Sequence, residues 1–212
     1  MSHGIRKASS LLVLTLCSGA GCAPSTAAAR TPVQTTEVDA SPELERYLPF
    51  EDGTVFSYDT HSEHDNAHGT LIVQVSRPRP GRVDLRMGSR TERLQFVPDG
   101  VVYVDGGYLL KAPLTKGGTW RSRTGTVRVE ATDETVTVPA GSFPGCLRTV
   151  EASQDAGQGR TVSQVYCPHV GLVSVEVEGM TPEGLNRETA VLRSFGPRVD
   201  VTSENVTTTT DE

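Results

Sequence analysis

The sequence lacks the motifs by which many enzymes and nucleotide-binding proteins are recognised. It contains no phosphate-binding loop and no dinucleotide-binding fingerprint, both of which need fixed glycine spacings. Ser142 stands in Ala-Gly-Ser-Phe, without the Gly-x-Ser-x-Gly spacing that exposes a nucleophilic serine. The acidic residues are scattered, so no catalytic pair of carboxylates stands out. We therefore nominate no catalytic residue and no cofactor, and we expect a protein that is not an enzyme.

Basic residues are outnumbered and nowhere clustered. The 20 Lys and Arg residues stand against 26 Asp and Glu residues, which gives a formal net charge of −6. A chain of this charge is repelled by the phosphates of nucleic acids and by anionic lipid headgroups. We therefore expect no nucleic-acid partner.

Aromatic residues and long helical patterns are also scarce. Five Phe, five Tyr and one Trp leave most of a core to aliphatic, β-branched side chains. The one predicted helix is a single turn over residues 43–47, which follows Ser41 and Pro42. Elsewhere the apolar positions alternate with a period of two residues, which is typical of strands.

The alternating segments are short, and turn-forming pairs such as Pro80-Gly81 and Ala140-Gly141 separate them. This pattern predicts an all-β domain with little helix. We expect a single antiparallel meander that forms a strongly curved sheet or barrel, because curvature protects the sheet edges. The predicted strands cover residues 54–60, 69–77, 82–87, 91–97, 101–105, 108–112, 119–122, 125–131, 134–138, 146–153, 160–167, 171–178 and 189–195.

Two of the four cysteines flank a predicted hairpin. The runs 147–152 and 161–166 alternate and enclose a gap that contains Gly and Asp. The positions of Cys146 and Cys167 sum to 313, so a hairpin that turns between residues 156 and 157 places them directly opposite each other. Opposed residues on antiparallel strands have Cα atoms about 4.5 to 5.5 Å apart, within reach of a disulfide. We predict that these two cysteines are bonded.

A disulfide requires an oxidising compartment, and the N-terminus has the pattern of an export signal. Two basic residues precede the apolar residues 11–16, and the small residues 18–21 precede Cys22. The apolar segment is far shorter than the roughly 20 residues that span a bilayer. An alternative is ordinary signal cleavage after the alanines at 27–29, which would discard Cys22 and release a soluble protein.

The run Gly-Ala-Gly-Cys at residues 19–22 resembles the lipobox of bacterial lipoproteins, with Gly19 where Leu is usual. The resemblance implies that Cys22 is lipidated and becomes the mature N-terminus, so that the membrane is a partner through a lipid anchor. We expect a protein of the bacterial cell envelope, an outer-membrane lipoprotein that faces the periplasm or the surface. The alternative cleavage predicts a secreted or soluble periplasmic protein.

The predicted organisation has four parts. They are a signal peptide at 1–21, the lipidated cysteine with a disordered tether at 22–40, a β-domain at 41–197 and a disordered tail at 198–212.

Four motifs of the β-domain carry a further resemblance. They are L-P-F-x-x-G at 48–53, Y-L-L-K-A-P-L at 108–114 followed by Gly117 and Trp120, V-P-A-G-x-F at 138–143, and Y-C-P-x-V-G-L-V at 166–173. Together they resemble a group of uncharacterised bacterial lipoproteins and secreted β-rich domains. The resemblance implies the fold and export and carries no catalytic residue with it. A more distant similarity is to the half-barrels of periplasmic lipoprotein carriers.

The strongest candidate for chemistry is a group of three histidines. His61, His64 and His68 are spaced by three and four residues, which on a helix would place them on one face as metal ligands. Turn-forming residues surround them, however, and favour a solvated hairpin loop. His169 neighbours Cys167, but a cysteine in a disulfide is no nucleophile, so we expect a structural turn there.

Four aromatic residues in predicted strands are candidates either to line a ligand cavity or to pack in the core. They are Phe96, Tyr103, Tyr108 and Trp120.

Three functions remain open. The first is a non-enzymatic envelope protein whose β-domain has a structural role or binds another envelope component. The second is a carrier that holds an apolar ligand or lipid inside the curved sheet. The third is a metal-binding protein or metal-dependent enzyme that uses the histidine loop. An apolar cavity larger than a packed barrel needs would favour the carrier, and convergent histidines would favour the metal.

Overall fold

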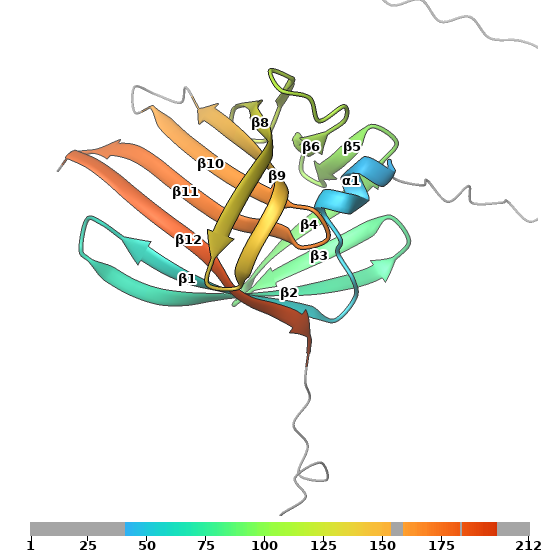
Figure 1. Ribbon diagram of the computed structural model, residues 1–212, viewed down its shortest axis with the longest axis horizontal. Coiled ribbons are helices and arrows are strands. Elements are labelled where there is room, and N and C mark those ends of the chain that lie inside the picture. The colour runs from blue at the N-terminus through green and yellow to red at the C-terminus, as the bar shows by residue number, and fades with distance from the viewer. Residues whose placement is uncertain (1–40, 154–158, 183, 199–212) are drawn as a thin grey trace, which may run out of the picture. The chain divides into compact units, whose positions relative to one another are not determined.

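The computed structural model describes residues 41–153, 159–182 and 184–198, which form one short helix and twelve strands (Figure 1). The predicted signal peptide, Cys22, the tether, the hairpin turn at 156 and 157 and the tail from 199 onward lie outside these residues. No helix in the described ranges has the length and apolar character needed to cross a membrane. The elements are α1 (Pro42–Tyr47), β1 (Thr54–Ser62), β2 (Ala67–Arg79), β3 (Arg82–Met87), β4 (Arg90–Val97), β5 (Gly100–Tyr103), β6 (Tyr108–Lys111), β7 (Thr119–Arg121), β8 (Thr126–Val138), β9 (Gly141–Ser153), β10 (Arg160–Cys167), β11 (Gly171–Thr181) and β12 (Gly184–Pro197).

All the described strands belong to one antiparallel sheet, which confirms the predicted fold class. The order across the sheet is β6-β5-β4-β3-β2-β1-β12-β11-β10-β9-β8-β7. The first and last strands therefore pair with each other, from Thr54 opposite Pro197 to Ser62 opposite Glu188. The two edges of the sheet are β6 and β7, which are neighbours in the sequence. The sheet curves so strongly that it is nearly closed (Figure 1).

The two edges approach each other along a seam between β6 and β7. Gly107, in the β5–β6 turn, lies so close to the opposite backbone that a Cβ atom there would collide with the backbone nitrogen of Arg123. The Arg123 guanidinium donates to Glu92 on β4 and to Asp105, with N–O distances of 2.8 and 3.2 Å. It also lies 4.4 Å from the centroid of the Tyr103 ring. Side chains, rather than a strand pairing, thus join the edges of the described sheet.

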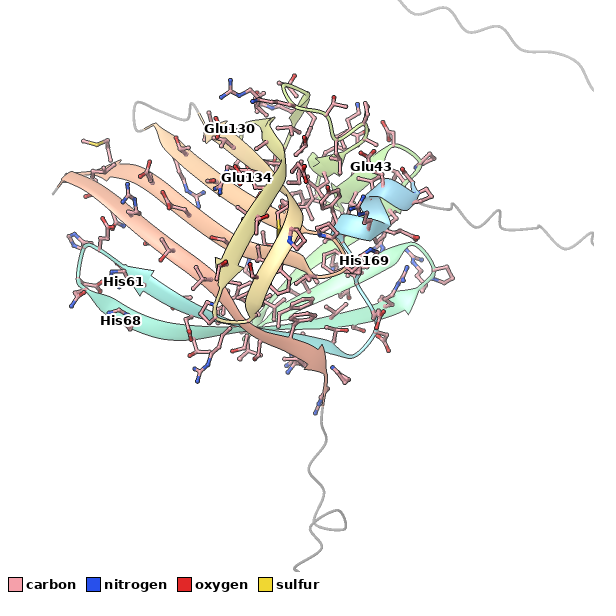
Figure 2. All side chains as sticks on the ribbon, in the orientation of Figure 1. Glu43, His61, His68, Glu130, Glu134 and His169 are labelled. Atoms are coloured by element: carbon pink, nitrogen blue, oxygen red, sulfur yellow. A yellow bond between two sulfur atoms is a disulfide. The ribbon has the colours of Figure 1, made fainter. Side chains whose placement is uncertain are left out.

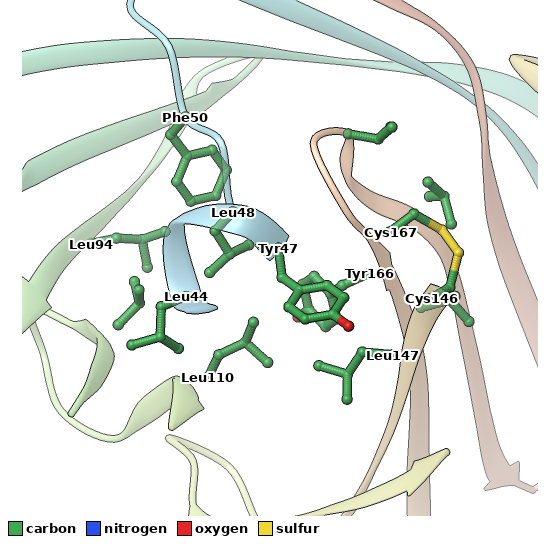
Figure 3. Packing of buried hydrophobic residues seen from close by; sticks show 14 of the residues in the cluster. Leu44, Tyr47, Leu48, Phe50, Leu94, Leu110, Cys146, Leu147, Tyr166 and Cys167 are labelled. Carbon is green, nitrogen blue, oxygen red and sulfur yellow. A yellow bond between two sulfur atoms is a disulfide. The ribbon is translucent and has the colours of Figure 1, made fainter. Parts of the chain in front are cut away.

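Helix α1 covers one end of the curved sheet (Figure 1). Pro42 opens the helix, where its fixed φ suits the first turn and its missing N–H is no loss. Leu44 and Leu48 are fully buried, and Figure 3 shows them in the same cluster as leucines of β4, β6 and β9. The Tyr47 hydroxyl donates to the carbonyl oxygen of Gly145 at 3.1 Å. The apolar side chains of this N-terminal segment therefore close one end of the sheet.

The hairpin of β9 and β10 has the predicted register. Ser153 lies opposite Arg160 and Leu147 lies opposite Tyr166, so the paired positions sum to 313. The predicted disulfide is present between Cys146 and Cys167, whose Cα atoms are 4.2 Å apart (Figure 3). The disulfide joins β9 and β10 next to the end that α1 covers.

One predicted division of the chain is wrong. Residues 125–131 and 134–138 are not two strands but one, β8, which pairs with β9 along its length. The register against β9 shifts between Val129 and Ala131, between Ala131 and Glu134, and again before Val136. The intervening polar residues are therefore absorbed as bulges and form no turn.

Candidate functional site

The curved sheet encloses a cavity of about 230 Å³. About eight strands give a barrel that its own side chains can fill, and wider barrels leave space inside. This sheet has twelve described strands, and α1 fills only one end. The cavity lies beside that end, where Leu48 and Phe50 contribute to its wall. At about 30 Å³ for each water-sized group, it has room for roughly seven or eight such groups.

The walls of the cavity are mainly apolar. Because strand residues alternate between the two faces of a sheet, alternate positions line the cavity, for example Phe56 and Tyr58 on β1 and Leu71 and Val73 on β2. Strands β3 to β6 close it on one side, and β10 to β12 close it on the other. A space of this kind fits an apolar group and offers little to a strongly polar one.

Three tyrosines place hydroxyl groups around the cavity. The Tyr58 hydroxyl donates to the carbonyl oxygen of Leu172 at 2.9 Å. Burial raises the pKa of Tyr103 to about 12, and the nearby Arg123 only partly opposes that rise. Tyr166 is 1% exposed, and its hydroxyl has no hydrogen-bond partner within the described part of the chain. Burial also raises the pKa of Tyr166, so these phenols are neutral at physiological pH and supply no base.

The carboxylates nearest the cavity are engaged by neighbouring side chains. Glu92 lines the cavity and accepts the hydrogen bond from Arg123 that holds its pKa below the usual range. Arg90 also contacts Glu92. Glu151, which is buried, accepts a hydrogen bond from the Thr124 hydroxyl at 2.6 Å. These pairings favour a site that holds a ligand over one that transfers a proton.

Two further hollows continue from the cavity along the inner face of the sheet. Val175 and Ala190 line both the cavity and a hollow of about 350 Å³, which we call the neck. Val177 and Glu188 line both the neck and a hollow of about 410 Å³, which we call the mouth. The mouth also includes Thr124, Ser153, Arg160 and Asn186. The shared residues place the cavity, neck and mouth next to one another, in that order, along the inner face.

The structure brings two of the three predicted histidines together. His61 on β1 lies opposite His68 on β2, with ring centroids 4.4 Å apart. His64 lies in the turn between them, where Asp65 Oδ1 accepts a hydrogen bond from the backbone nitrogen of Ala67 at 3.2 Å. The described residues contain no group of three or more His, Cys, Asp or Glu side chains placed to hold a metal. The hairpin thus forms a stacked pair and not a three-ligand site.

His169 and Ser142 are not part of the histidine pair. Figure 2 shows His169 beside α1, whereas His61 and His68 lie toward the far ends of β1 and β2. The backbone nitrogen of His169 donates to the carbonyl oxygen of Arg46 at 2.7 Å, and its φ is +61°, as expected of a turn residue. Ser142 lies on β9, and its hydroxyl is 3.0 Å from that of Thr137.

Of the four aromatic candidates, Tyr103 lines the cavity. Phe96 and Trp120 are buried in the core. Tyr108 packs against that core from β6, and its hydroxyl donates to Asp99. Three of the four aromatic residues therefore pack in or against the core, and one lines the cavity.

No protein-family model matches the sequence, and no curated protein sequence matches it. Two solved structures are similar in fold. One is a Bacteroides fragilis protein inferred to be exported, with a YmcC-like fold; the match has 13% identity and a TM-score of 0.44, and covers 69% of this chain and 96% of that one. The other is a Parabacteroides distasonis protein inferred to be a lipoprotein; the match has 14% identity and a TM-score of 0.38, and covers 69% and 96% of the two chains.

Most residues around the cavity were not singled out from the sequence. Phe56, Leu71 and Leu172 occupy alternate apolar positions of predicted strands, a pattern that also describes a filled core. The pattern identifies the inner face of each strand. It carries no signal that the space between the inner faces stays open.

Proposed function

We propose that this protein is an exported protein of the bacterial envelope whose β-domain binds a small apolar molecule and catalyses no reaction. The observation that carries the proposal is the apolar cavity of about 230 Å³ inside a sheet too wide for its own side chains to fill. An empty apolar cavity forfeits dispersion contacts, and a ligand restores them. The cavity therefore favours the carrier over a purely structural domain.

Two features of the sequence support export. The basic, apolar and small residues before Cys22 have the order of a lipoprotein signal. The buried disulfide between Cys146 and Cys167 needs an oxidising compartment in which to form. We place the protein at the outer membrane, held by lipid on Cys22, with the β-domain reaching its ligand in the periplasm or at the surface.

The test is binding of N-phenyl-1-naphthylamine, an uncharged apolar dye that fluoresces when it leaves water. Residues 23–212, exported behind an unlipidated signal peptide, contain the whole described core and avoid detergent. We expect saturable binding at one site per chain. Ala190→Phe should abolish binding, because position 190 lines both the cavity and the neck.

The matched control is Val191→Phe, which introduces the same side chain at the neighbouring residue, on the other side of β12. This variant should bind the dye as the unsubstituted protein does. Absence of saturable binding by the folded protein, or equal binding by the Ala190→Phe variant, would refute the proposed function.

A further inference from the structure

The path from cavity to mouth changes from apolar to polar along its length. Paired residues on β10, β11 and β12 lie side by side on the inner face, so the strand register defines successive levels. At the deepest level Tyr166 lies opposite Leu172, and Leu192 of β12 is also fully buried. The outermost level has Arg160 opposite Gly179, which lies opposite Asn186.

The two levels between them complete the gradient. Gln164, Val175 and Ala190 pair in sequence at the boundary of cavity and neck. Val162, Val177 and Glu188 pair in the same way where the neck opens into the mouth. The first charged side chain on these three strands therefore appears at Glu188, and the next level adds Arg160 and Asn186. A ligand that fills the whole path must be apolar at one end and polar at the other.

The length of the apolar part can be estimated from the strand. Leu172 and Val177 are five residues apart on β11, which corresponds to about 17 Å at roughly 3.3 Å per residue. The hydrocarbon core of a bilayer is about 30 Å thick, so one acyl chain spans about 15 Å. A single extended chain that enters as far as Leu172 would thus have its polar end close to Val177.

The charges at the mouth indicate which charges the polar end of the ligand carries. No ion pair within the described ranges engages Arg160 or Glu188, although Glu188 accepts a hydrogen bond from the Asn186 amide at 3.3 Å. A guanidinium binds a phosphate well, and a carboxylate binds an ammonium group. A head that carries one charge of each sign matches both side chains, whereas a simple anion or cation is repelled by one of them.

We propose that the ligand is a single-chain amphipathic lipid, whose chain fills the cavity and neck and whose zwitterionic head lies at the mouth between Arg160 and Glu188. The inference rests on the proposed function, because it requires that the cavity accept an apolar group. It adds the class of ligand, its direction of entry and the residues that meet its head.

The test is displacement of bound N-phenyl-1-naphthylamine by lysophosphatidylcholines below their micelle-forming concentrations. Affinity should rise about fourfold for each added CH₂ group until the chain fills the apolar part, about 17 Å long, and then level off. Arg160→Glu should weaken lysophosphatidylcholine binding about three- to fivefold relative to dye binding by the same variant, since the side chain is exposed. The matched control is Arg193→Glu, the same charge change on the outer face of β12, which should alter neither.

The outcomes separate this inference from the proposed function. If the dye binds and the lipid does not displace it, the lipid assignment is wrong and the apolar site stands. If the lipid displaces the dye equally from the Arg160→Glu and unsubstituted proteins, the placement of the head at the mouth is wrong. If the dye itself does not bind, the proposed function fails and the inference fails with it.

Discussion

Removal of the disulfide between Cys146 and Cys167 should lower the stability of the β-domain by about 3 kcal/mol. The bond closes a loop with a sequence separation of 21 residues, and the loss of chain entropy in the unfolded state gives this magnitude. For a domain of this size, 1 kcal/mol corresponds to about 2 to 4 °C in the unfolding midpoint. The double variant Cys146→Ala, Cys167→Ala should therefore unfold roughly 6 to 12 °C below the unsubstituted protein.

The assay is thermal unfolding followed by circular dichroism, under oxidising and reducing conditions. The reduced, unsubstituted protein is the control for packing, because it keeps both sulfur atoms while it lacks the bond. Its midpoint should lie close to that of the double variant, since both cysteines are fully buried and alanine leaves only a small void. Equal midpoints for all three forms would refute the reasoning, as would two reactive thiols at these positions in the unfolded, unreduced protein.

Four other outcomes can be measured. Cys22→Ser should move the protein from the membrane fraction to the soluble fraction, and cleavage after residue 29 with unchanged fractionation would contradict the anchor. Changing the three histidines of the β1–β2 hairpin to Ala should cost at most about 1 kcal/mol in urea unfolding, and zinc should not raise the melting temperature of the unsubstituted protein. Hydrogen bonds from Arg123 hold the pKa of Glu92 below that of an unfolded Glu, which is about 4.3. The stability that the ionised Glu92 contributes is therefore fully present above that pH and is lost as the pH falls through the folded pKa. Glu92→Gln should therefore lower the urea midpoint at pH 7, with a difference that begins to shrink as the pH falls below about 4.3 and is gone only below the folded pKa. Tyr166→Phe should be neutral or stabilising in the same assay, because it removes a buried hydroxyl that lacks a partner in the described structure; a loss above 1 kcal/mol would contradict this.

Local patterns were sufficient to predict the strands and one hairpin. The period of two residues fixes which side chains share a face, and a short loop leaves one register that keeps both apolar faces inward. For β9 and β10 that register predicted the position of Cys146 opposite Cys167. The sequence pattern wrongly predicted a break between two strands at residues 132 and 133. A β-bulge accommodates the same polar residues that a turn prefers, so the strand continues through them.

The candidate site depends on contacts between distant parts of the chain. The pairing of β1 with β12 determines how many strands the sheet wraps, and those strands lie more than 120 residues apart in the sequence. No local pattern encodes that pairing, so a hollow interior could not be separated from a filled one. Tyr103 was predicted as a candidate for either outcome, whereas Val175 and Ala190, which join the cavity to the neck, look like ordinary strand residues.

Because the sheet ends at the seam between β6 and β7, no strand pairing fixes the circumference of the described sheet. In a fully closed barrel, a continuous ladder of backbone hydrogen bonds resists any increase in circumference. Here the order of the described strands ends at β6 and β7, so the edges can separate without breaking a backbone pairing. Side chains oppose the separation: the ion pairs of Arg123 contribute about 0 to 1 kcal/mol each, and the buried Leu110 on β6 and Trp120 on β7 would lose apolar contacts. Widening of the interior would therefore cost side-chain contacts at the seam and no backbone pairing between the described strands.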